Sequence, residues 1–138
     1  MAAIKILHLL AMASGVGFGL AGLVIARVSA GADPAATPTV MKIRMRLGQG
    51  GFLSLVILWA TGIWLWQTTH GGAVSALFLS KIAVVILLTM LSGWMNVISL
   101  RAARGGPRPD PARMAQMARA ATALAVLAVI LAGLAFGT

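Results

Sequence analysis

The chain has 138 residues, of which 60% are hydrophobic and 9% are charged, and its mean hydropathy is +0.99. Because a soluble domain carries roughly 25% charged residues, this composition excludes a soluble domain and indicates an integral membrane protein. The chain contains no cysteine, which excludes disulfides, thiolate metal sites and cysteine nucleophiles. The net charge of +9 does not indicate a nucleic-acid partner, because the basic residues lie between apolar segments, where they set membrane topology.

Four apolar segments follow one another, each long enough to cross a bilayer as a helix. They are residues 3–28, 50–67, 74–100 and 112–136. The connections between them are short, and residues 29–40, which contain Asp33-Pro34 and Thr37-Pro38, are expected to form a loop. The sequence therefore predicts one all-α membrane domain over residues 1–138, an up-down-up-down bundle of four transmembrane helices. A cleaved signal peptide is the alternative for the first segment, but Arg27 follows the apolar run instead of preceding it.

The basic residues predict an orientation. Nine of the eleven flank the first and third connections, namely Arg27, Lys42, Arg44, Arg46, Arg101, Arg104, Arg108, Arg113 and Arg119, whereas Lys5 and Lys81 lie toward the other side. By the positive-inside rule these two connections are cytoplasmic. We therefore expect a multi-pass protein of the bacterial inner membrane with both termini in the periplasm.

The first segment carries one ionisable side chain well inside its apolar run. At about 100° per residue, it falls on a stripe of otherwise small or soft residues: His8, Met12, Gly15, Gly19, Gly22 and Ala26. Small residues four apart let membrane helices approach closely, so we expect this face, with His8, to point at the other helices.

The third segment has one polar stripe, formed by Lys81, Ser92, Asn96 and Ser99. Such groups are costly in lipid and usually face the bundle interior. His8 precedes Arg27 by nineteen residues and Lys81 precedes Arg101 by twenty, which places both about 28–30 Å from the cytoplasmic boundary. We therefore expect His8 and Lys81 to share one level near the outer edge of the membrane.

These residues suggest a binding site. An imidazole can ligate haem iron or copper, and Lys81 can pair with a porphyrin propionate or a substrate anion, with Ser92 and Asn96 as further cofactor contacts. A copper site would use His8 together with two further donors. Met12 supplies a soft thioether, and His70, in the turn after the second segment, supplies a second imidazole. The alternatives are that His8 is an interfacial side chain, that Lys81 reaches the headgroups, and that Met12 only fills space.

Three short motifs resemble a known group of proteins. They are Leu7-His8-Leu9-Leu10-Ala11, Thr61-Gly62-Ile63-Trp64-Leu65 and Ser80-Lys81-Ile82-Ala83-Val84-Val85. This order resembles a broad group of small bacterial membrane proteins that includes the CopD-like copper-resistance proteins, the HemJ-type protoporphyrinogen oxidases and related families of unassigned function. A HemJ-type identity would imply oxidation of protoporphyrinogen, with bound haem b and with His8 and Lys81 as the matching positions.

Three functions remain open at this point. The first is binding of haem or a porphyrin at His8 and Lys81, in a redox or haem-biosynthesis context and with Lys81 as the candidate catalytic residue. The second is copper handling by His8, Met12 and His70. The third is a non-catalytic subunit of a larger membrane complex, or a homo-oligomer, that packs through the stripe at Gly15 and Gly19. In each case the lipid bilayer is a partner and nucleic acid is not.

Overall fold

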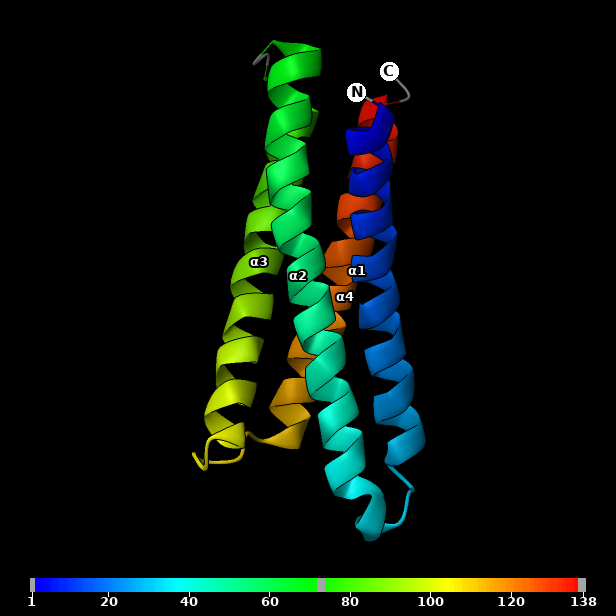
Figure 1. The fold of residues 1–138 in the computed structure, drawn as a ribbon, viewed down its shortest axis with the longest axis vertical. Coiled ribbons are helices and arrows are strands. Elements are labelled where there is room, and N and C mark those ends of the chain that lie inside the picture. Colours follow the sequence, from blue (N-terminus) through cyan, green and yellow to red (C-terminus); the bar gives the residue numbers. More distant parts are fainter. Residues whose placement is uncertain (1, 72–73, 137–138) are drawn as a thin grey trace.

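A computed structural model describes residues 2–71 and 74–136, apart from the side chains at positions 70, 135 and 136. It contains four long helices and one short 3₁₀ turn, η1 (Pro34–Ala36). The helices are α1 (Ala2–Ser29), α2 (Thr37–His70), α3 (Ala76–Ala103) and α4 (Pro111–Phe136) (Figure 1). All four are long and apolar enough to cross a membrane, and the described residues form no strand. The predicted all-α four-helix membrane fold is confirmed.

The helices form a ring in which each contacts two neighbours. Helix α1 lies against α2 and α4, and α3 lies against the same two helices. Successive helices run in opposite directions (Figure 1). One end of the bundle therefore carries both termini and the α2–α3 turn, and we call it the termini end. The other end carries the α1–α2 and α3–α4 connections, and we call it the loop end.

Helix α2 begins earlier than the sequence suggested. Residues 29–40 were expected to form a loop, but η1 starts at Pro34 and α2 at Thr37. A Pro in the first turn suits a helix start because the missing N–H has no intrahelical partner there, and Pro38 takes that place in α2. The helix has 34 residues, which gives about 51 Å, so its basic first turns extend beyond a hydrocarbon core of about 30 Å.

Short polar side chains cap the starts of α3 and α4. Asp110 Oδ1 accepts the backbone N–H of Ala112 at 3.0 Å, just before α4. Ser75 Oγ accepts the N–H of Phe78 at 3.2 Å at the start of α3. These caps satisfy backbone donors that have no partner inside the helix, so the connections can stay short and hold neighbouring helices antiparallel.

The predicted small-residue stripe of α1 does face the other helices. A Cβ placed on Gly15 would lie 3.5 Å from Ser54 Cβ of α2, and one on Gly19 would lie 3.0 Å from Thr122 Oγ1 of α4. Large apolar side chains lie mostly on the outside of the bundle, whereas the buried apolar residues are Ala11, Leu55, Leu88, Ala128 and Ala132. This distribution suits a protein whose outer surface meets lipid, where helices associate by close packing of small residues.

We expect Gly19→Leu to destabilise the bundle by about 1–3 kcal/mol, because its Cβ would lie only 3.0 Å from Thr122 Oγ1 and α1 or Thr122 would have to shift. Gly17→Leu is the matched control, since a Cβ on Gly17 meets nothing within 4 Å and its side chain would point into lipid. The measurement is the thermal unfolding midpoint in detergent. Equal loss of stability in the two variants would contradict the α1–α4 contact.

Candidate functional site

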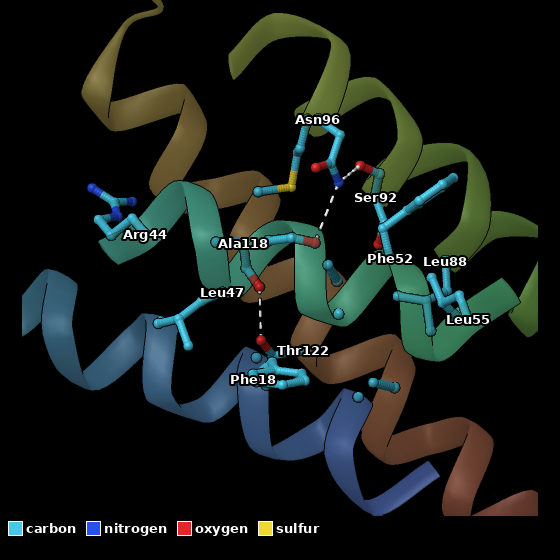
Figure 2. Close-up of a pocket in the computed structure, with 18 of the residues that line it drawn as sticks. Phe18, Arg44, Leu47, Phe52, Leu55, Leu88, Ser92, Asn96, Ala118 and Thr122 are labelled. Atoms are coloured by element: carbon cyan, nitrogen blue, oxygen red, sulfur yellow. Dashed lines mark hydrogen bonds between the residues drawn. The ribbon is translucent and has the colours of Figure 1, made fainter. Parts of the chain in front are cut away.

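A long cavity lies between the four helices. Its volume is about 1380 Å³, and its lining is mainly apolar. At the termini end His8 and Lys81 line it, and at the loop end Arg44 and Arg108 do. Figure 2 shows its middle and loop-end part, where apolar side chains from α1, α2 and α3 surround the space: Phe18, Leu47, Phe52, Leu55 and Leu88. The residues with ionisable side chains therefore lie at the two ends of an apolar interior.

The imidazole of His8 is buried and held by a hydrogen bond to the neighbouring helix α2. Its Nδ1 lies 2.7 Å from Thr61 Oγ1, and the Thr61 hydroxyl donates to the carbonyl oxygen of Ile57 at 2.7 Å. A hydroxyl has a single hydrogen, so it cannot also donate to His8. His8 Nδ1 is therefore the donor to Thr61, and Nε2 of the neutral ring carries a lone pair instead of a proton.

The second nitrogen, Nε2, is not fully enclosed by protein atoms. Nε2 makes no hydrogen bond within the described part of the chain, where every fully buried side-chain nitrogen or oxygen has a partner. Gly62 leaves space for the imidazole ring, since a Cβ at this position would lie 3.4 Å from His8 Cε1. An imidazole with one nitrogen anchored and the other exposed is oriented to bind a metal or to accept a proton.

Lys81 lies at the same end of the cavity. It is half-buried on α3 and lines the cavity wall. Both residues on which the sequence argument depended therefore line the same end of the cavity, and their joint role stays a prediction. Met12, one helical turn from His8, also lines the cavity.

An aromatic pair lies beside this site. Trp66 of α2 and Phe78 of α3 are stacked, with ring centroids 5.6 Å apart and planes inclined by 17°, and both line the cavity. Trp66 follows Gly62 by one turn, and Phe78 precedes Lys81 by three residues. The termini end of the cavity thus combines an imidazole, an ammonium group and flat aromatic surfaces.

Two of the predicted cofactor contacts lie elsewhere. Ser92 and Asn96 line the cavity, but Asn96 Nδ2 donates to the carbonyl oxygens of Ser92 at 2.9 Å and of Gly48 at 3.4 Å (Figure 2). Gly48 precedes Gly62 by fourteen residues on α2, or about 21 Å. Ser92 and Asn96 therefore share a face with Lys81, but not its level.

A metal site with several protein ligands is not formed by the described side chains. The side chain of His70 lies outside the described residues, so its predicted role as a copper ligand stays a prediction. Within residues 2–71 and 74–136, no three His, Cys, Asp or Glu side chains come together in a way that could hold a metal ion.

Comparison of the chain with known proteins identifies no relative. No protein-family profile, no curated protein and no solved structure matches the chain. The resemblance to the CopD-like and HemJ-type group therefore stays a prediction, and the function has to be argued from the site itself.

Thr61 is the site residue that the sequence argument missed. It is buried in the middle of an apolar span and is followed by Gly62. A hydroxyl group in a span, next to a residue that lets a neighbouring helix approach, is the signal that could have found it. Helical periodicity alone does not tell which of two neighbouring helices will meet His8.

Thr61→Val removes the acceptor for His8 Nδ1 while keeping the shape of the side chain. We expect wild-type His8 to carry its proton on Nδ1 and the variant to shift toward the Nε2-protonated tautomer, since Nδ1–H loses its partner at a cost of about 1–3 kcal/mol. The measurement is the ¹⁵N chemical shifts of the His8 ring in detergent or bilayers, in a His70→Gln background that leaves one histidine.

Thr89→Val is the control for this experiment. Thr89 accepts a hydrogen bond from Trp59 Nε1 at 3.0 Å and donates to the carbonyl of Val85, so it repeats the arrangement of Thr61 without touching His8. An Nε2-protonated ring in the wild type would contradict the tautomer that we assign.

Proposed function

We propose that this protein binds haem, or a closely related porphyrin, at the termini end of its cavity, near the periplasmic face of the bacterial inner membrane. The observation that carries the proposal is the state of His8, which lines the cavity. Its Nδ1 is held by Thr61 at 2.7 Å, and its Nε2 makes no hydrogen bond within the described residues. Histidines that ligate a metal commonly donate their other ring N–H to a fixed acceptor, which sets the tautomer and the ring orientation.

The neighbouring residues supply what a porphyrin needs besides an iron ligand. Lys81 provides a cation for the propionates, and burying a carboxylate in an apolar bundle requires such a partner. Trp66 and Phe78 offer flat apolar surface beside the two polar groups. A bound haem would supply one-electron chemistry at its iron, and the chain would hold, orient and shield it.

The size of the cavity supports a ligand of this class. Sites for small molecules and cofactors usually measure about 300–1,000 Å³ and have mainly apolar walls with a few placed polar groups. The cavity of about 1380 Å³ exceeds this range because it extends along the bundle, so a ligand bound at the termini end would leave the loop end unfilled. Lys81 would contact the anionic groups of such a ligand.

Copper handling is the second candidate, with weaker support. Among the described side chains its ligands are His8 and Met12, which lie one turn apart and both line the cavity. Two donors of this kind can hold Cu(I), but a site that retains the ion needs more. A purely structural role, as an accessory subunit or homo-oligomer, leaves unexplained why a buried histidine keeps one nitrogen open.

The first test is the absorption spectrum of the purified full-length protein after addition of haem, oxidised and then reduced with dithionite. We expect a Soret band that shifts on reduction and that His8→Ala removes or moves. Met12→Leu is the matched control, since it changes the copper donor one turn away and should leave the band unchanged. Imidazole added to His8→Gly should restore the spectrum, because the free base can take the vacated place.

The outcomes separate the candidates. If all variants bind haem alike, the site at His8 is wrong. If haem does not bind but Cu(I) does, with loss in both His8→Ala and Met12→Leu, copper handling replaces the proposal. Binding of neither, together with co-purification of a larger complex, would leave the structural role.

Lys81→Met should weaken binding of haem about tenfold or more, because a propionate loses a charged hydrogen-bond partner. Lys81→Arg keeps the charge and should retain most of the affinity. The measurement is a haem titration followed at the Soret band, repeated with a porphyrin whose propionates are esterified. The effect of Lys81→Met should vanish with the ester, and an undiminished effect would mean that Lys81 does not pair with the propionates.

A further inference from the structure

The loop end of the cavity has a chemistry of its own, separate from the site at His8. Arg44 of α2 is half-buried and lines the cavity, and Arg108 of the α3–α4 connection lies at the same end. Behind them the walls are apolar, formed by side chains such as Phe18, Leu47 and Leu88 (Figure 2). We propose that this end holds one anionic phospholipid of the cytoplasmic leaflet, with its phosphate at Arg44 and Arg108 and an acyl chain in the apolar interior.

The charges of this end favour an anionic headgroup. No ion pair or side-chain hydrogen bond occupies Arg44 or Arg108 within the described part of the chain. The carboxylates of Asp33 and Asp110, which also line this end, accept backbone N–H groups of Ala35 and Ala112 at 2.9 and 3.0 Å. Nine basic residues flank the two connections of the loop end, so two acidic residues cannot neutralise them.

Two polar side chains of α3, Asn96 and Ser99, lie near the loop end, where they could contact the polar part of a lipid. Asn96 precedes Arg101 by five residues and Ser99 precedes it by two, which puts them about 7 and 3 Å inside the basic boundary. The Asn96 amide N–H groups bond backbone carbonyls, and its Oδ1 and the Ser99 hydroxyl have no hydrogen-bond partner within the described residues. Both lie at the depth of the glycerol and ester groups of a phospholipid, between the headgroup and the chains.

The proposal also accounts for the length of the cavity. The His8 site and Asn96 are about 21 Å apart along α2, measured from Gly62 to Gly48. A porphyrin at one end leaves apolar walls at the other, and an acyl chain covers such surface without burying a polar group. Basic pockets between transmembrane helices on the cytoplasmic side are a recurrent site for anionic lipid headgroups.

The test is native mass spectrometry of the full-length protein in detergent, titrated with phosphatidylglycerol and, separately, phosphatidylcholine. We expect one phosphatidylglycerol to be retained in preference to phosphatidylcholine. Arg44→Gln and Arg108→Gln should each weaken this binding about fivefold, the equivalent of about 1 kcal/mol for each basic residue near the surface.

The matched controls are Arg46, two residues from Arg44, and Arg104, four residues from Arg108. Arg46 and Arg104 are exposed, belong to the same end and do not line the cavity, so Arg46→Gln and Arg104→Gln should leave the affinity unchanged. Thermal midpoints of the lipid-free variants check that all four fold.

Three results would overturn the proposal. Equal losses in all four variants would mean a diffuse attraction of surrounding lipid instead of a site. Equal retention of the two lipids would remove the role of the headgroup charge. Displacement of the lipid by inorganic phosphate at constant ionic strength would make the ligand a free anion. None of these results bears on the Soret band of the His8 site, so the two proposals fail separately.

Discussion

A buried imidazole in an apolar bundle needs a hydrogen-bond partner, and the arrangement of α1 against α2 supplies one. The chain of bonds runs from His8 Nδ1 to Thr61 Oγ1 and on to the carbonyl of Ile57, with both distances at 2.7 Å. An unpaired polar group in hydrocarbon costs several kcal/mol, so this contact fixes how α1 sits against α2. The direction of the His8–Thr61 hydrogen bond also decides the tautomer of His8. A threonine hydroxyl that donates to a backbone carbonyl can only accept a hydrogen bond from His8.

Close contact between helices follows from glycine at the crossing points. Gly62 leaves room for the His8 ring, Gly15 meets Ser54, and Gly19 meets Thr122. In lipid there is little hydrophobic force between helices, so van der Waals contact and a few hydrogen bonds hold the bundle together. The large side chains that line the interior do not fill it, and a cavity of about 1380 Å³ remains between the helices.

Much of this could be read from the sequence, because a bilayer imposes strong constraints on helix length and polarity. The four spans and the inward face of His8 follow from hydropathy and helical periodicity. Helix α2 starts at Thr37, inside the segment 29–40 where a loop was expected, because proline favours a helix start as well as a turn. Ser92 and Asn96 were grouped with Lys81 by face, yet they lie eleven and fifteen residues further along α3. A shared face predicts a shared cavity, whereas a shared site also requires a shared depth.

Contacts between helices were beyond the sequence argument. Periodicity states that His8 points inward, but the choice of Thr61 as its partner depends on how α1 and α2 are rotated and shifted against each other. The stacking of Trp66 on Phe78 depends in the same way on α2 and α3. These contacts change the functional argument, because a histidine that only faces inward can be a packing residue. A cavity-lining histidine whose Nδ1 is held and whose Nε2 makes no hydrogen bond within the described residues has the features of a ligand, and the proposal of cofactor binding rests on this difference.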